Sequence, residues 1–232
     1  MSNLGIILLD ELKGYLKSKI VIILFIGLPI LAVLMSWLTG DLEDFPATYL
    51  TTVLATSIAG ALGSIMLATS ITSEMNKNVY DLFLIRPVKR WNIVVAKYIS
   101  VYACLVAAVA LSIVTGIIID FIKDVDIPQY FLDQTIDSIF TVFFALGITC
   151  SFGTLFGITI KSVAGSALLS LYVGNQASSI LTLVIPLMAD IVELEYGIAF
   201  PFDPFVLSMI IGIAVSTTIL LISIKVFEKK QF

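Results

Sequence analysis

The sequence predicts an all-α membrane protein with six transmembrane helices, formed by a single domain over residues 1–232. Its composition is 59% hydrophobic and 13% charged, against roughly 45–50% and about 25% in soluble globular domains. Six uncharged runs also divide the chain, and each has the roughly 20 residues that a helix needs to cross a bilayer. The predicted spans are 20–38, 48–72, 93–119, 138–160, 163–188 and 205–226.

The distribution of basic residues predicts the orientation in the membrane. Six spans place both termini on the same side, and all but Lys123 of the 13 Lys and Arg residues then fall on that side. Because Lys and Arg are enriched in cytoplasmic loops, we expect cytoplasmic N- and C-termini in a multi-pass protein of the cell membrane. Acidic residues gather on the opposite side, so the net charge of −4 does not indicate nucleic acid as a partner.

Residues 3–18 are predicted to form an amphipathic helix in the membrane interface, in contact with lipid headgroups. A frayed beginning of the first span is the alternative. Asp10, Lys13 and Lys17 face away from an apolar stripe at helical spacing. The stripe consists of Leu4, Leu8, Leu12, Tyr15 and Leu16.

The outer connections are predicted to be short. Residues 39–44 link the first two spans, and residues 120–137 link the third and fourth. Residues 189–204 combine acidic residues with Pro201 and Pro204, which favours a re-entrant or interfacial hairpin over a plain loop.

A second amphipathic helix is predicted at 74–86, between the second and third spans. Met75, Val79, Leu82 and Phe83 share one face of it. The helix should end before Pro87, because proline disfavours helical geometry in the residue that precedes it. A structured cytoplasmic helix between two spans indicates a surface that contacts a partner.

Enzymatic chemistry is not predicted for this chain. It contains no histidine, which excludes the Ser-His pairs and His-based zinc sites of many membrane hydrolases. Cys104 and Cys150 fall inside spans, as expected of buried apolar side chains. No catalytic, metal or cofactor residues are predicted. The chain also lacks a G-x-x-x-x-G-K-[ST] phosphate loop, so any ATP would have to be hydrolysed on another polypeptide.

Polar side chains inside the spans mark a candidate substrate path. Tyr172, Asn175 and Gln176 fall within the fifth predicted span, where amides serve either as substrate contacts or as links between helices. Buried charges are expected to be missing, which argues against an ion-coupled transporter. The motifs Gly60-x-x-x-Ser64 and Gly153-x-x-x-Gly157 permit close approach of helices, and packing within one subunit is favoured over a dimer contact.

The stretch from Glu74 to Lys97 resembles the signature loop of ABC-2 type ABC-transporter permeases. It has a glutamate, then the leucine-rich sequence DLFLIRPVKR from Asp81 to Arg90, and then a lysine seven residues later. The layout of the whole chain is similar too. The arginine-proline version resembles the branch grouped with copper-enzyme-maturation permeases, and similar loops occur in peptide and drug exporters.

The resemblance implies that 74–86 is a coupling helix that docks on a separate ATP-binding subunit, which would carry ATP and Mg²⁺. It further implies a second permease copy as partner. Glu74 would lie at the membrane boundary, paired with Lys77 or Lys97. The implied docking residues are Met75, Val79, Leu82, Phe83, Arg86, Pro87 and Arg90.

The expected function is thus export of an amphipathic or hydrophobic substrate, such as a peptide, lipid or drug. The short outer loops depart from relatives with large external domains, which favours a substrate that partitions through the membrane. An ATP-independent channel or secondary transporter, and a non-transporting scaffold, are the alternatives.

Overall fold

The fold is helical throughout the part of the chain that the computed structural model describes, namely residues 3–38, 47–77, 79, 89–123, 129–181 and 204–230. No strand occurs among these residues. The helices are α1 (Asn3–Leu16), α2 (Lys19–Leu38), α3 (Ala47–Asn76), α5 (Arg90–Ile122), α6 (Gln129–Thr159), α7 (Val163–Ser179) and α9 (Pro204–Lys229).

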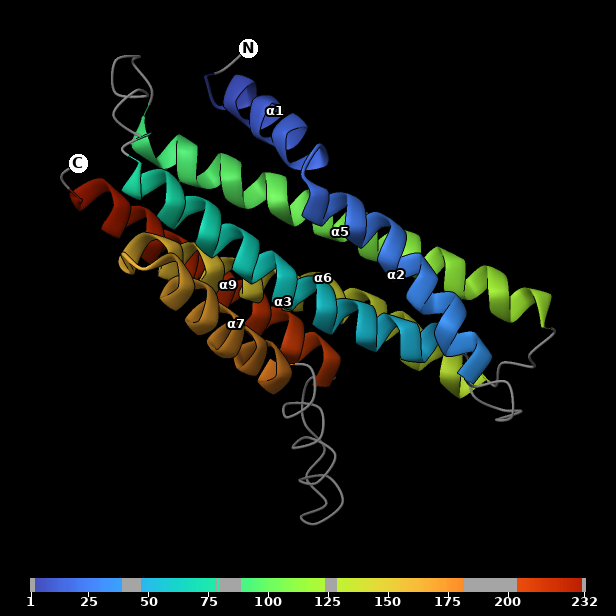
Figure 1. Cartoon of the computed structure of the whole chain (residues 1–232). Helices are drawn as coiled ribbons and strands as arrows, with labels where there is room; N and C mark the ends of the chain where they lie inside the picture. The colour runs from blue at the N-terminus through green and yellow to red at the C-terminus, as the bar shows by residue number, and fades with distance from the viewer. Residues whose placement is uncertain are drawn as a thin grey trace, which may run out of the picture.

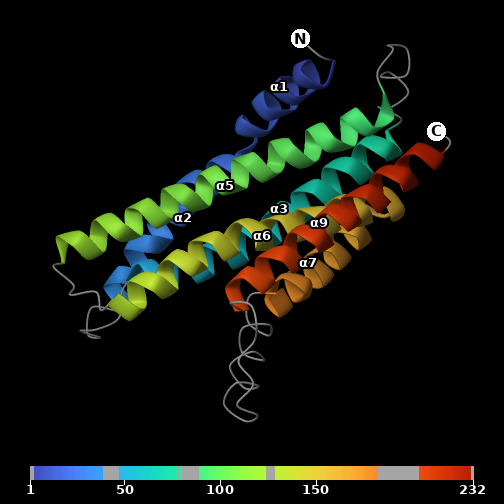
Figure 2. The same cartoon turned by 180° about the vertical axis from the view of Figure 1, so that it is seen from behind.

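The long helices form an up-and-down bundle (Figure 1). Both termini lie at the same end of it, which we call the N/C end, and α5 and α6 extend from there to the far end (Figures 1 and 2). In the middle, α3 packs on α6, and both also contact α5 and α7. The helix α2 lies against α5 and α3 on one side, and α9 lies against α6 on the other.

Five of the described helices are long and apolar enough to cross a membrane, which supports a multi-pass membrane protein. They are Lys19–Leu38, Thr48–Asn76, Trp91–Ile122, Ile139–Thr159 and Val206–Lys229. The remaining predicted span, 163–188, is described only as far as residue 181, and the 17 residues of α7 form its first part.

The helices extend beyond the uncharged runs, and the predicted outer link over 120–137 is wrong for most of its length. The helix α5 continues to Ile122 and α6 already begins at Gln129. A charge ended each run in the sequence, but a charge does not interrupt the backbone hydrogen bonding of a helix. The 33 residues of α5 span about 50 Å, well above the roughly 30 Å of a hydrocarbon core.

Asp120 shows how a charge is accommodated inside such a helix. It is 2% exposed at the far end of α5 and accepts hydrogen bonds from the backbone N–H and the hydroxyl of Thr48. The carboxylate thus satisfies a free N–H in the first turn of α3. Asp120 is therefore a helix contact and not the start of a loop.

The predicted coupling helix lies partly in α3 and partly outside the described residues. Glu74 and Met75 belong to the last turn of α3, which ends at Asn76. Residues 78 and 80–88 are outside the described residues. The predicted hairpin at 189–204 is outside them too, except for Pro204, the first residue of α9. Proline suits this position because its missing N–H would have no partner in the helix.

Small residues join α3 to α6 towards the N/C end, and we call this contact the close seam. A Cβ atom at Gly153 would stand 2.7 Å from the carbonyl oxygen of Ser64, and one at Gly157 would stand 3.1 Å from Ala68 Cα. A Cβ atom at Gly60 would lie 3.2 Å from Thr149 Cγ2. The two small-residue motifs therefore face each other, which confirms that they pack within one subunit.

Candidate functional site

A buried lysine connects three helices at the N/C end. Lys97 on α5 is 2% exposed. Its Nζ atom lies 2.8 Å from Oε1 of Glu11 on α1 and 2.7 Å from Oε1 of Glu74 on α3. Because a buried charge is costly unless it is paired, these contacts hold the three helices together. We call Glu11, Glu74 and Lys97 the ionic cluster. Of the two bases considered for Glu74, the structure pairs it with Lys97.

Tyr15 extends the ionic cluster by a chain of hydrogen bonds. Its hydroxyl donates to Ser70 Oγ over 3.1 Å, and the Ser70 hydroxyl donates to Glu74 Oε1 over 3.1 Å. The Lys97 ammonium also lies 5.8 Å from the centre of the Tyr15 ring, within cation–π range. Burial raises the pKa of Tyr15, so the hydroxyl remains a neutral donor.

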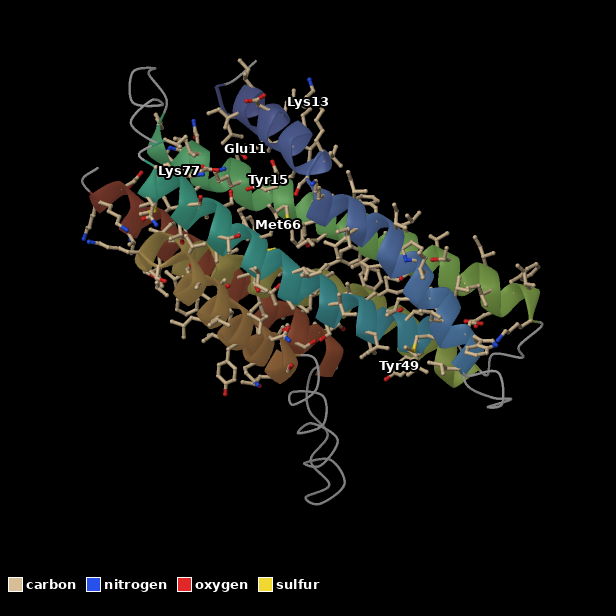
Figure 3. All side chains as sticks on the ribbon, in the orientation of Figure 1. Glu11, Lys13, Tyr15, Tyr49, Met66 and Lys77 are labelled. Carbon is tan, nitrogen blue, oxygen red and sulfur yellow. The ribbon has the colours of Figure 1, made fainter. Side chains whose placement is uncertain are left out.

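The helix α1 matches its prediction only in part. Lys13 points away from the bundle, while Glu11 and Tyr15 point towards it (Figure 3). Leu16, the last residue of the predicted apolar stripe, is 46% exposed. The Ser100 hydroxyl donates to the carbonyl of Leu8, so α1 packs directly on α5.

The expectation that the spans contain no buried charge is wrong, because Lys97 lies inside the candidate span Trp91–Ile122. The sequence did contain a signal for Glu11, one of the two partners of Lys97. Leu8, Glu11 and Tyr15 are separated by three and four residues, so a carboxylate shares the apolar face of a helix. An acid on such a face needs a buried base.

The residues predicted to dock an ATPase lie largely outside the described structure. Met75 is half-buried and packs against the core. Val79 is half-buried. Nothing is described for Leu82, Phe83, Arg86 and Pro87, nor for the side chain of Arg90.

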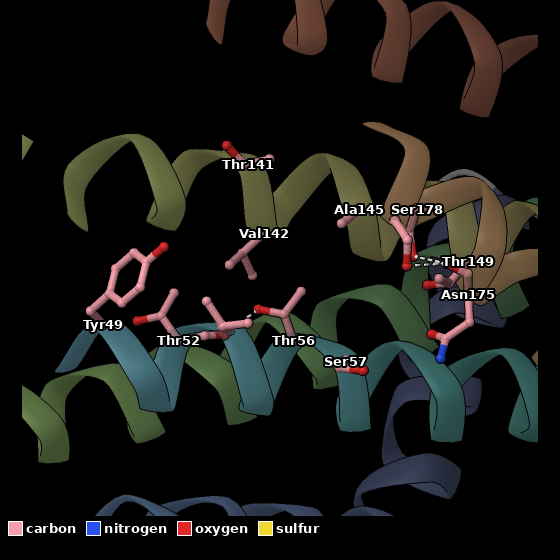
Figure 4. Close-up of a pocket in the computed structure, with 12 residues that line it drawn as sticks. Tyr49, Thr52, Thr56, Ser57, Thr141, Val142, Ala145, Thr149, Asn175 and Ser178 are labelled. Atoms are coloured by element: carbon pink, nitrogen blue, oxygen red, sulfur yellow. Dashed lines mark hydrogen bonds between the residues drawn. The ribbon is translucent and has the colours of Figure 1, made fainter. Parts of the chain in front are cut away.

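A cavity of about 220 Å³ lies between α3 and α6, on the far-end side of the close seam. Side chains of the two helices face each other across it, and residues of α7 lie at one end (Figure 4). None of the described side chains that line the cavity carries a charge. It is lined by Tyr49, Thr52, Val53, Thr56 and Ser57 of α3, Thr141, Val142, Ala145 and Thr149 of α6, and Asn175, Ser178 and Ser179 of α7.

Five hydroxyl groups that line the cavity direct their protons to helix backbones. Thr52 and Thr56 donate to the carbonyls of Thr48 and Thr52, and Thr149 donates to that of Leu146. Ser178 and Ser179 both donate to the carbonyl of Asn175. Each of these five hydroxyl oxygens then retains lone pairs and can accept hydrogen bonds from a ligand.

The three predicted path residues do not come together. Asn175 lines the cavity, whereas Tyr172 is 64% exposed and Gln176 is also exposed, and neither lines the cavity. Sequence reasoning missed the threonines, although Thr48, Thr51, Thr52 and Thr56 recur within nine residues of an apolar run. That recurrence was the available signal for a polar surface inside a span.

Comparison with known proteins gives no family for this chain. No protein-family model matches the sequence, and a search of curated proteins finds no match. The ionic cluster, the close seam and the cavity are the features that bear on its function.

Proposed function

We propose that the chain is the membrane-spanning subunit of an exporter that is driven by a separate ATP-binding subunit. The resemblance of residues 74–97 to the ABC-2 permease loop suggests the class. The observation that carries the proposal is the ionic cluster, because Glu74 and Lys97 lie on α3 and α5, the two helices that the loop connects.

This arrangement suits the transmission of force from a docked partner. A force applied to residues 77–89 would act on α3 and α5 together, because the ion pair between Lys97 and Glu74 links the two helices next to the loop. The close seam then passes the motion from α3 to α6, since closely packed interiors are hard to compress and transmit strain. The cavity between α3 and α6 is where a change in their spacing would act on a substrate.

In this proposal two copies of the chain assemble with two ATP-binding subunits in the cell membrane, with the N/C end in the cytoplasm. The chain itself performs no chemistry, and ATP with Mg²⁺ binds only to the partner. The substrate is amphipathic or hydrophobic.

The test is co-purification from native membranes in mild detergent. We expect an ATP-binding subunit to remain bound, and we expect the double substitution Leu82→Asp and Phe83→Asp to remove it while membrane insertion persists. The control is Lys13→Asp, which places an acid on an exposed part of α1 at the same end and should leave the complex intact. A chain that purifies alone under all conditions would contradict the proposal.

One observation favours a second candidate, a secondary transporter. Ionisable groups inside a span commonly belong to ion paths, and Lys97 is such a group. Its two short ion pairs argue instead for a static link. Transport by reconstituted chain alone, driven by a proton or sodium gradient, would select the secondary transporter.

A further inference from the structure

We propose that the cavity between α3 and α6 binds the uncharged, hydroxyl-rich headgroup of a membrane amphipath, such as the sugar of a glycosylated lipid. The inference rests on the proposed function only in treating this amphipath as the exported substrate. The binding itself requires no ATPase.

The lining selects against charged ligands. None of the twelve lining side chains carries a charge, and a buried ionic group without a counter-charge is strongly disfavoured. A phosphate or carboxylate headgroup would also meet the acceptor lone pairs of the Thr52, Thr56 and Thr149 hydroxyl oxygens, which repel it. The ionic cluster does not supply a counter-charge, because the Lys97 ammonium is paired with two carboxylates.

The lining selects for hydrogen-bond donors. The hydroxyls of Thr52, Thr56 and Thr149 use their protons on helix carbonyls, so a ligand must supply the protons that these oxygens accept. The Asn175 carboxamide adds both an acceptor and donors from α7, and its side chain makes no hydrogen bond to any described residue. The acceptors come from three helices. A compact polyol has donors on all sides and fits this arrangement better than an extended peptide.

The size and the position of the cavity indicate a headgroup with its tail outside. Its volume of about 220 Å³ is below the roughly 300–1,000 Å³ of pockets that enclose whole drug-sized ligands. It lies between two candidate membrane spans. Val53, which lines it, is 46% exposed, so the cavity reaches the outer surface of the bundle. Acyl chains can therefore remain among the surrounding lipids while the headgroup occupies the cavity.

The experiment compares three lipids with identical acyl chains by native mass spectrometry of the purified full-length chain. They are glucosyl-diacylglycerol, diacylglycerol and phosphatidylglycerol. We expect glucosyl-diacylglycerol to bind about tenfold more tightly than either of the others, because unmatched polar groups in a cavity lose about that factor each. Equal binding of glucosyl-diacylglycerol and diacylglycerol would show a nonspecific lipid layer, and preference for phosphatidylglycerol would show an anion site. Either result overturns the proposal.

Two variants with one control locate the binding. Asn175→Leu preserves the size of the side chain and should weaken glucosyl-diacylglycerol binding about tenfold. Thr56→Val preserves shape and removes an acceptor, so it should weaken binding about threefold. Gln176→Leu makes the same amide-to-leucine change on the adjacent exposed side chain and should leave binding unchanged. Unchanged binding in both cavity variants would overturn the proposal.

These outcomes are independent of the ATPase. If the lipid preference holds and no ATP-binding subunit associates, the proposed exporter fails and the headgroup site stands. If the subunit associates and the lipid preference is absent, the exporter stands and the headgroup site fails.

Discussion

The two halves of the contact between α3 and α6 are built differently. Towards the N/C end, the close seam brings Gly153 and Gly157 against the backbone of α3. Towards the far end, the same two helices separate around a cavity lined by Thr52, Thr56 and Thr149. The same pair of helices thus forms a close contact in one half and encloses a cavity in the other.

The difference follows from side-chain size and polarity. Glycine and alanine let backbones touch, so the close seam gains dispersion energy over its whole length. Threonine is larger, and its hydroxyl needs partners that an apolar wall does not give. The close seam therefore fixes the placement of α3 and α6 towards the N/C end, and the cavity leaves space for a ligand between their far-end halves. Five substitutions, each measured against a control variant, test how the bundle is held together.

The largest effect is expected for Lys97→Met. It leaves Glu11 and Glu74 without their base, and the loss is about 3 kcal/mol, at the lower end of the roughly 3–5 kcal/mol for buried pairs. The low end applies because the two glutamate side chains keep 20% and 27% of their surface exposed. Thermal unfolding in detergent measures the change, with exposed Lys13→Met as the control. Adding Glu11→Gln and Glu74→Gln should restore part of the loss; a single variant as stable as the parent would contradict the role of the ionic cluster.

Gly153→Ala should cost about 2 kcal/mol through overpacking. The new methyl group would stand 2.7 Å from the Ser64 carbonyl oxygen, which is backbone and cannot rotate away. Gly174→Ala is the matched control, since a Cβ atom there meets nothing closer than 3.5 Å, and it should be neutral or slightly stabilising. Unfolding in detergent compares the two. Equal stabilities would mean that the close seam is looser than its geometry indicates.

Thr72→Val should cost about 1 kcal/mol, typical of a hydrogen bond between membrane helices. The Thr72 hydroxyl donates to the Gly157 carbonyl over 3.0 Å and lies 3.0 Å from Ser166 Oγ on α7. Thr52→Val removes only a bond within one helix at the cavity, so its stability should change by less. The same unfolding assay compares the two variants. A larger loss of stability in Thr52→Val than in Thr72→Val would contradict the distinction between a tightly packed half and an open half.

The smallest effect is expected for Gln176→Ala and Tyr172→Ala. Both side chains are exposed on α7, and surface substitutions usually change stability by within about 0.5 kcal/mol. Transport by the complete complex should also be unaffected, whereas Asn175→Ala should lower it. Equal losses of transport in all three variants would support the sequence-based prediction that Tyr172, Asn175 and Gln176 together form the substrate path.

The sequence predicted the helical membrane fold well because apolar length is a strong local signal. It also predicted that the small residues at four-residue spacing pack helices closely within one subunit, but not that the two motifs meet each other. The cavity was only partly predictable. Asn175 and Gln176 are adjacent and chemically alike, and only the rotation of α7 about its axis separates their surroundings. The pairing of Glu74 with Lys97 was predicted as one of two alternatives. The contribution of Glu11 was missed, because Glu11 and Lys97 are 86 positions apart in the sequence.

Asp120 gives the bundle a property that neither half has alone. Its carboxylate holds the first turn of α3 at the far end, and Lys97 holds the last turn of α3 at the N/C end. Both anchors are on α5. Sliding α3 by a single residue, about 1.5 Å along its axis, would break the contacts of Asp120 and of Lys97 together. The helix α3 is therefore fixed to α5 at both of its ends. A change in the width of the cavity therefore cannot come from α3 sliding along α5.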